Sequence, residues 1–532
     1  MKKSKPTRGL GLVILTATLF LAACGTGPSP ATADPSQTNG EWVQPSNGNG
    51  PAGGNSEVVF LLPSDVVNLD AHRTMDIISL ELDRNIFSRL LKYDIDNNLA
   101  YDLAIGFEQI DPLTWVFELR RGITFHDGTP FNAEAAYLNF SRVLDPAFAS
   151  PRLFVLDVIS DVSVLGPYTI QLTTYFPFSP LPNTIAHSPH FISPTAIQEE
   201  LDGGLTVGQN PVGTGAFMFA SRTYGHEIRL VANPDFWLGA PYIDYLTYLV
   251  VPEAGTRLAL LESGEAHAMQ VSPTDAQVLE HIPGIDIQLI DSTRSIFLGF
   301  NNSRPPFDDV RLRQAVAYAI DLDVIIDGIL EGFGLRGAGP VSPVIQAAPI
   351  DVVAKPYDMV RARELVLEAD ADGLVVSFYT NTGNPIQAMI LEYVQAQLAQ
   401  IGIVAELNLV EWGTFLEITA AGIPDMFVHG WSSTTGDADY GIFILFHSSI
   451  PGSGGNRFHT NNPALDAILD EARLITDVAA RTALYNIAGQ MLVDEANAVF
   501  LYYPIIPVAT QGISGLSVDF NGTSNFQYVR LR

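Results

Sequence analysis

The chain has 532 residues, of which 47% are hydrophobic, and carries 58 acidic against 28 basic side chains, a net charge of −30 at pH 7. Such an excess of negative charge repels phosphate backbones and argues against nucleic-acid binding. With a single cysteine, the chain forms no intramolecular disulfide, so its stability must come from a large apolar core.

The N-terminus has the pattern of an export signal. Four basic residues in the first eight positions precede an apolar run at 9–23. This run of about fifteen residues is shorter than the roughly twenty needed to span a bilayer, and is typical of a secretory signal peptide. The tetrapeptide LAAC at 21–24 resembles the lipobox of bacterial lipoproteins, which implies a signal peptide at 1–23 and acylation of Cys24. The alternative is a plain signal peptide with an incidental cysteine.

Residues 24–56 are rich in Gly, Pro, Ser and Asn. Such a segment buries too little apolar surface to order itself, so a flexible tether is expected. Without the signal segment the mature chain carries 24 basic and 58 acidic residues, a net charge of −34. Lipid, tether and globular body in this order predict a protein that is anchored outside the cytoplasmic membrane, at the cell surface or in the periplasm.

The first strands differ in their surroundings. The run VVFLL at 58–62 predicts a buried strand. The runs at 114–119 and 168–172 lie among turn residues without long helices between them, which is typical of antiparallel strands in a smaller, β-rich region.

The later sequence predicts a βαβ unit. A strand at 374–379 is followed by Asn384-Pro385, a helix-start signal. A stripe of mostly apolar residues with helical spacing follows, Gly402 ends it, and 403–410 returns as a strand. The chain is therefore expected to be an α/β protein with parallel strands, built as two lobes with an inserted module.

Motifs that suggest an enzyme or a metal site are interpreted more simply as local structure. His126-Asp127-Gly128 is read as a tight turn rather than a catalytic pair. His187 and His190 are close, but their spacing is not that of a strong metal site. HExxH, GxSxG and P-loop motifs are absent from the sequence. We therefore expect no catalytic activity, no cofactor and no resident metal.

Blocks in order along 57–532 resemble the peptide/nickel-type solute-binding proteins of ABC importers, known as family 5. One block alone would be a weak signal, but so many blocks in this order along one chain make a chance similarity very unlikely. The blocks are LLKYD (90–94), DLA (102–104), WVFELRRGITFHDGTPFNAE (115–134), NPVGTG (210–215), NPDFW (233–237), LLESGEA (260–266), FNN (300–302) and PFDDVRLRQA (306–315).

The resemblance implies a periplasmic-binding-protein fold, in which two hinged lobes close on a ligand and a further β-rich domain is inserted in the first lobe. The hinge is expected at two crossing segments, 295–301 and 498–504. The implied boundaries are 57–97 with 206–297 and 500–532 for lobe I, 98–205 for the inserted domain, and 298–499 for lobe II.

The segment HGWSSTTGDADY at 429–440 is the strongest candidate for ligand contact. In peptide-binding relatives a Gly-Trp followed by an aspartate lies in the cleft, where the carboxylate receives the ligand's ammonium group in a charge-assisted hydrogen bond. The resemblance therefore implies Trp431 and Tyr440 as aromatic contacts, with either Asp437 or Asp439 as the anchor. The alternative for both aspartates is capping of a turn and of the following helix.

Other cleft candidates come from segments where relatives touch ligand. They are Thr74 and Asp76 after the first strand, Arg294 before the first crossing, and Trp412 after a strand end. Arg294 is suited to hold a carboxylate in a bidentate fork, or to form a structural ion pair at the hinge. Trp412 lines a side-chain pocket or belongs to the core.

The sequence thus predicts a monomeric, non-catalytic receptor that captures short peptides and delivers them to an ABC permease in the membrane. Glutathione or another peptide conjugate is the alternative ligand. A nickel or haem receptor is the alternative of another class, and it would require histidines that converge in the cleft.

Overall fold

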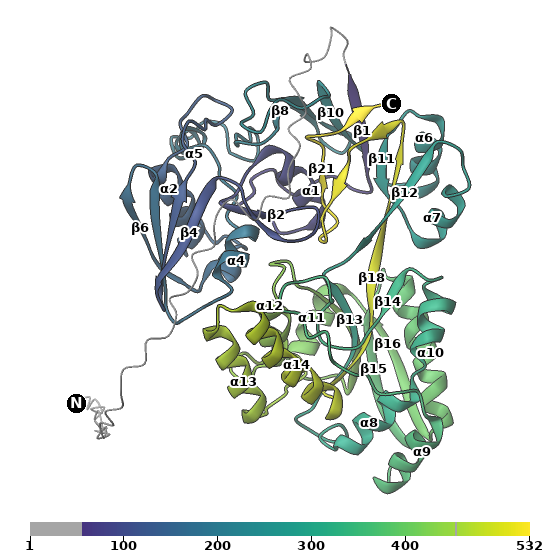
Figure 1. Ribbon diagram of the computed structural model, residues 1–532. Helices are drawn as coiled ribbons and strands as arrows, with labels where there is room; N and C mark the ends of the chain where they lie inside the picture. The colour runs from purple at the N-terminus through teal and green to yellow at the C-terminus, as the bar shows by residue number, and fades with distance from the viewer. Residues whose placement is uncertain (1–55, 453–454) are drawn as a thin grey trace, which may run out of the picture. The chain divides into compact units, whose positions relative to one another are not determined.

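A computed structural model describes residues 56–452 and 455–532 (Figure 1). The predicted signal peptide, Cys24 and the tether up to residue 55 lie outside the described residues. Among the helices of the described ranges, none combines the length and the apolar character that a membrane span needs.

Most strands belong to one 12-stranded mixed sheet, and the predicted strand at 58–62 is one of them. The members are β1 (Glu57–Leu62), β8 (Phe217–Thr223), β9 (Glu227–Ala232), β10 (Tyr245–Val250), β11 (Ala268–Gln270), β12 (Ile285–Asp291), β13 (Arg294–Phe300), β14 (Gly334–Arg336), β15 (Leu374–Asn381), β16 (Ile403–Val410), β17 (Met426–Ser432) and β18 (Ala498–Gln511). Their order is β16-β15-β17-β13-β18-β11-β1-β10-β9-β8, with β12 and β14 also paired to β18.

A separate four-stranded sheet is antiparallel throughout, as the turn-rich sequence predicts. Its strands are β4 (Ala104–Asp111), β5 (Thr114–Leu119), β6 (Ile159–Gly166) and β7 (Thr169–Thr174), in the order β4-β5-β7-β6. Trp115 pairs with Leu172, so the two predicted strands are direct neighbours. Three two-stranded sheets complete the β structure: β2 (Leu91–Tyr93) with β3 (Leu99–Tyr101), β19 (Ile513–Ser514) with β22 (Arg530–Leu531), and β20 (Ser517–Val518) with β21 (Ser524–Asn525).

Helices occupy the connections between these strands. They are α1 (Ile77–Ile86), α2 (Ala133–Leu144), α3 (Leu153–Leu156), α4 (Leu181–His187), α5 (Pro194–Leu201), α6 (Ala254–Ser263), α7 (Pro273–Leu279), α8 (Val310–Ala319), a π-helix η1 (Val324–Ile329), α9 (Met359–Glu368), α10 (Pro385–Gln400), α11 (Trp412–Ala420), α12 (Ala438–Phe446), α13 (Pro463–Leu474) and α14 (Val478–Asp494).

The predicted βαβ unit is present, since β15 and β16 are parallel neighbours and α10 connects them. Asn384 caps α10 by accepting a hydrogen bond from the backbone N–H of Gln387, and Gly402 ends the connection at φ +90°.

The predicted apolar stripe on α10 is only partly right. Met389 is 47% exposed, whereas Gln387 is buried, with its Oε1 accepting from Thr380 Oγ1 at 2.9 Å. A buried amide is tolerated there because this hydrogen bond satisfies it.

The long strand β18 connects two parts of the sheet (Figure 1). Its first residues, from Ala498, pair with β13, and its later residues, to Gln511, pair with β12.

The apolar core is divided between the same two parts of the chain. One cluster is built from 58–268 and 508–529, and two others are built from 296–502. This division runs between the segments assigned to lobe I and lobe II, while the inserted domain shares the first cluster with lobe I; the boundaries given above stay a proposal.

Candidate ligand-binding cleft

A pocket of about 240 Å³ lies where segments far apart in the sequence meet. Its wall combines apolar, hydroxyl, amide and basic side chains. It is lined by Met75, Ile77, Leu80, Arg84, Arg89, His187, His190, Ser292, Thr293, Ser432, Thr434, Asp519, Asn521 and Thr523. A larger hollow of about 650 Å³ is lined only by residues between 144 and 175, so a ligand there would not contact the 298–499 segment.

One wall of the pocket is formed by α1. Asp76 caps this helix by accepting from the backbone N–H of Ser79 at 2.9 Å, which fixes where the helix begins. Ile77, Leu80 and Arg84 follow with spacings of three and four residues, so they lie on one face of the helix. This face presents an apolar surface with a cation at its C-terminal end.

The opposite wall contains Thr293, Thr434 and Asn521, which hydrogen bonds hold together. Thr293 Oγ1 donates to Asn521 Oδ1 at 3.1 Å, and Asn521 Nδ2 donates to Thr434 O at 3.3 Å. Asn521 therefore bridges the start of β13 and the segment after β17. Because 293 and 521 belong to the proposed lobe I and 434 to lobe II, the bond from Asn521 to Thr434 crosses the proposed boundary, whereas the bond from Thr293 fixes Asn521 within lobe I.

Further contacts link lobe I and the inserted domain to lobe II. Tyr93 donates its hydroxyl hydrogen to Thr435 O. Asn183 Nδ2 donates to the Tyr93 hydroxyl oxygen at 2.8 Å and to Gln346 Oε1 at 2.6 Å. Gly436 has φ +70°, and a Cβ there would lie 2.6 Å from the Tyr93 ring, so only glycine permits this approach. The structure therefore describes a state in which the two proposed lobes are in contact.

The pocket carries an excess of positive charge. Arg84 forms an ion pair with Asp519, but Arg89 has no hydrogen-bond or ion-pair partner among the described residues. Burial lowers the pKa of Arg89 to about 10, which leaves it protonated at pH 7. Burial also holds the pKa of His187 and His190 well below the ordinary value, so both imidazoles are neutral.

The two predicted anchor aspartates are already paired within the protein. Asp437 is fully buried, caps α12 through the backbone N–H of Asp439, and accepts from Arg481 Nη2. Asp439 accepts two hydrogen bonds from Arg473, at 2.8 and 3.1 Å. Burial raises the pKa of Asp437 to about 6 in spite of Arg481. In this state the capping alternative describes Asp437, and the anchor role stays a prediction.

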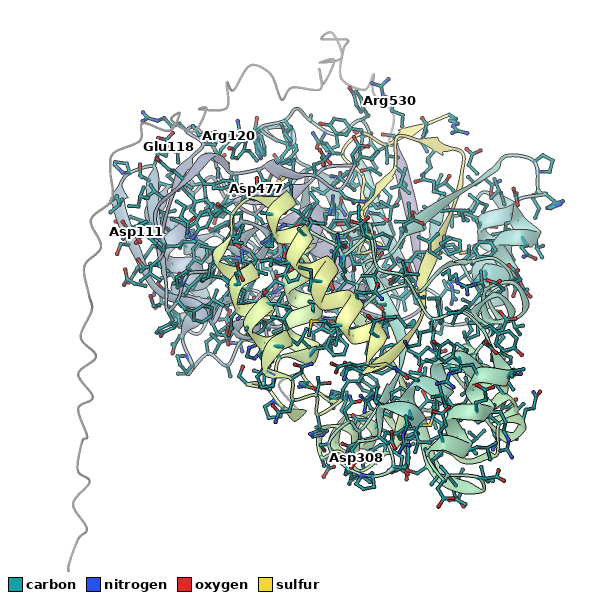
Figure 2. All side chains as sticks on the ribbon, turned by 60° about the horizontal axis from the view of Figure 1, so that its bottom comes forward. Asp111, Glu118, Arg120, Asp308, Asp477 and Arg530 are labelled. Atoms are coloured by element: carbon teal, nitrogen blue, oxygen red, sulfur yellow. The ribbon has the colours of Figure 1, made fainter. Side chains whose placement is uncertain are left out.

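The partners of these aspartates come from the two helices that follow. Arg473 lies on α13, and Arg481 lies in the first turns of α14. Asp477, labelled in Figure 2, caps α14 by accepting from the backbone N–H of Ala480 at 2.8 Å. This cap fixes the start of α14, and with it the position from which Arg481 reaches the aspartate.

The aromatic candidates lie near one another. Trp431 Nε1 donates to Tyr440 O at 3.0 Å, and the two rings are 5.5 Å apart. Tyr440 also contacts Phe154, with ring centroids 6.2 Å apart. Trp412 is 44% exposed and stacks on Phe415. Trp431 and Tyr440 thus form one aromatic pair beside the end of β17, whereas Trp412 belongs to a different stack.

Thr74, Asp76 and Arg294 flank the pocket without lining it. Thr74 donates its hydroxyl hydrogen to Asp76, and Met75 between them reaches the pocket. Arg294 pairs in register with Ser432, a pocket residue, and its guanidinium has no partner among the described residues. The segments around 74–76, 294 and 431–440 therefore meet at one place, and Trp412 does not join them; the side chains that line the pocket are mostly neighbours of the predicted ones.

Sequence reasoning missed Arg89 and Asn521. Arg89 stands within the largely apolar run NIFSRLLKY at 85–93, and a charge inside such a run is the signal that could have identified it. Asn521 carries no comparable signal, because it lies in a short turn whose role depends on contacts with residues near 293 and 434.

His126 and Asp127, which suggest a catalytic pair in the sequence, have structural roles. His126 Nε2 hydrogen-bonds to Gly215 O at 3.0 Å, while Asp127 accepts from Ser193 Oγ, so the two side chains do not form a pair. Gly128 has φ +82°, as the predicted turn requires. Throughout 56–452 and 455–532, no three His, Cys, Asp or Glu side chains lie close enough together to hold a metal ion.

Comparison with known proteins gives consistent matches. Residues 98–453 match the family model described as bacterial extracellular solute-binding proteins, family 5 Middle. The glutathione-binding protein GsiB of Escherichia coli (strain K12) is 30% identical over 451 residues, covering 83% of this chain and 87% of the relative.

Two solved structures extend the likeness to the fold. HbpA2 from Haemophilus parasuis has a TM-score of 0.82 at 25% identity, covering 90% of this chain and 100% of that chain. The periplasmic binding protein DppA from Helicobacter pylori, in complex with the peptide STSA, has a TM-score of 0.75 at 26% identity, covering 89% and 98%. These matches confirm the predicted two-lobed α/β fold. The chain belongs to family 5 of the bacterial extracellular solute-binding proteins, which bind a solute and are not enzymes.

Proposed function

We propose that this protein is the substrate-binding component of an ABC importer and that it captures a short peptide or a peptide-like solute such as glutathione. The observation that carries the proposal is the pocket at the contact between the proposed lobes, whose hydroxyl and amide groups suit the polar main chain of a peptide. Its volume of about 240 Å³ favours a ligand of a few residues over a long peptide.

Capture follows from the contacts across the lobes. A ligand that touches α1 and the end of β17 at once does so only in the closed state, so it shifts the population toward closure. The hydrogen bonds of Asn183 and Asn521 stabilise the same state. We propose that the closed, loaded form is the one delivered to the permease.

The location of the protein is part of the proposal. Acylation of Cys24 would hold the chain on the outer face of the cytoplasmic membrane, and 24–56 would give the receptor reach to its permease. Replacing Cys24 by Ser is expected to move the protein from the membrane fraction to the medium or periplasm. Retention of Cys24→Ser in the membrane fraction would refute the lipid anchor.

The function is tested by native mass spectrometry of the full chain, purified in mild detergent and measured before and after incubation with a dipeptide–tripeptide mixture or with glutathione. Adducts at short-peptide masses support the peptide receptor, and a single adduct at the mass of glutathione selects the alternative ligand. A metal or haem adduct, with no peptide or glutathione bound, would refute the proposal.

A further inference from the structure

Arg89 has an unusual environment for an arginine of this protein. Every other arginine of the described chain except Arg294 donates a hydrogen bond, forms an ion pair or stacks on a ring, as Arg84 does with Asp519 and Arg120 does with Trp237. The Nε atom of Arg89 is buried and has no hydrogen-bond partner. Of these two arginines, Arg89 is the one that lines the pocket.

The two carboxylates that act electrostatically on Arg89 already pair with other cations. Asp519 pairs with Arg84, and Asp102 lies 3.5 Å from Lys92 Nζ and accepts the backbone N–H of Arg89 itself. Arg84 and Arg152 lower the pKa of Arg89, whereas Asp102 and Asp519 raise it. Because both of these carboxylates already pair with other cations, neither forms an ion pair with the Arg89 guanidinium.

The remaining walls do not supply an anion either. His187 and His190 are neutral, and the rest of the pocket offers hydroxyl, amide and apolar groups besides the Arg84–Asp519 pair. Asp437 and Asp439, on the neighbouring segment, are paired with Arg481 and Arg473. A ligand's ammonium group thus finds no unpaired carboxylate among the pocket residues, whereas a ligand's carboxylate finds an unpaired guanidinium.

Arg89 is partly buried, and its Nε is enclosed without a hydrogen-bond partner, so part of the desolvation of its charge is not compensated. A carboxylate bound there in a fork would compensate it with two charge-assisted hydrogen bonds. We propose that Arg89 is an anion-binding subsite that receives a ligand carboxylate. Because the pocket offers no unpaired anion in return, the preferred solute is a short peptide-like molecule with more carboxylates than ammonium groups. This inference rests on the proposed function and names the ligand class of that site.

The test compares ligands that differ in charge. The full chain in mild detergent is titrated by calorimetry with glutathione, with Ala-Glu, with Ala-Ala, with the amide Ala-Ala-NH₂ and with tricarballylate. The variants are Arg89→Gln, the charge-conserving Arg89→Lys and Arg294→Gln. Arg121→Gln serves as the matched control, since it removes an exposed cation that stacks on Tyr168 and does not line the pocket.

The wild type is expected to bind the net-negative ligands most tightly. Arg89→Gln should weaken these ligands by about 10- to 100-fold, the effect of losing hydrogen bonds between charged groups, and should leave Ala-Ala-NH₂ almost unchanged. Arg89→Lys should retain part of the affinity. The ligand-free Arg89→Gln protein should also melt at a higher temperature than the wild type, because a partly buried charge without a partner is removed. A merely structural role would lower the melting temperature.

The outcomes separate the two proposals. Tight binding of peptides with no preference for charge, or loss of the preference in Arg294→Gln but not in Arg89→Gln, would overturn the subsite and leave the peptide receptor intact. Arg89-dependent binding of tricarballylate without any peptide or glutathione binding would overturn the peptide receptor and support the subsite. No binding of any carboxylate probe would overturn both.

Discussion

The ion pair between Asp439 and Arg473 allows a direct test of whether this aspartate stabilises the fold or anchors the ligand. Asp439 is 4% exposed and accepts two hydrogen bonds from Arg473, with a further long contact of 3.4 Å from the Tyr485 hydroxyl. Asp439→Asn keeps the size of the side chain but removes its charge. Arg473 would then remain against Phe443, 3.3 Å from the ring centroid, without its anion.

The magnitude follows from burial and geometry. Breaking a buried ion pair on one side costs about 3–5 kcal/mol, and the 12% exposure of Arg473 places this pair near the lower value. A folded body of this size loses roughly 1 kcal/mol of stability per degree near its melting temperature. Asp439→Asn is therefore expected to lower Tm by about 3 °C.

The assay is thermal unfolding without ligand, followed by calorimetric titration with the ligand found for the wild type. The matched control is Asp372→Asn, which breaks an exposed pair with Arg363 and should leave Tm almost unchanged, because solvent screens that pair. An Asp439→Asn protein with unchanged Tm and a tenfold or greater loss of affinity would show that the carboxylate is a ligand anchor, and our reasoning about its structural role would be wrong.

Acid should destabilise the fold through His126, whose pKa burial lowers to about 4, because the unfolded chain binds a proton there from about pH 6.5 downward. The loss between pH 6.5 and 4 is about 3 kcal/mol; denaturant titrations should show a flatter pH profile for His126→Gln and not for the exposed His226→Gln. Gly213→Ala should lose at least about 2 kcal/mol in the same assay, since its Cβ would lie 2.0 Å from Ile86 O, and an equal loss in Gly106→Ala, which has open space, would contradict this reason. Asn183→Ala removes hydrogen bonds to Tyr93 and Gln346 and should weaken ligand binding about 5- to 10-fold while enlarging the radius of gyration measured by X-ray scattering; an unchanged radius with unchanged affinity would show that these bonds do not favour closure.

Local signals in the sequence determined much of the fold. The βαβ unit at 374–410 was predictable because the strand runs, the Asn384 cap and Gly402 each act on their nearest neighbours. The antiparallel pairing of β5 and β7 followed from turn residues close to each strand. The exposed face of α10 was not predictable in full. This helix is apolar on several sides, so periodicity alone does not say that Met389 faces solvent.

By itself, the sequence determined the fold class, the segments that meet at the cleft and the absence of enzyme motifs. Only the tertiary structure decided which side chains are free to meet a ligand. Asp437 and Asp439 pair with Arg481 and Arg473, which lie 44 and 34 residues further along the chain, whereas the guanidinium of Arg89 has no hydrogen-bond or ion-pair partner among residues 56–452 and 455–532. A local motif fixes the position of a charge along the chain. Whether that charge is free to meet a ligand depends on whether an opposite charge from a distant helix lies beside it, and a sequence pattern does not give the distance in space between the two.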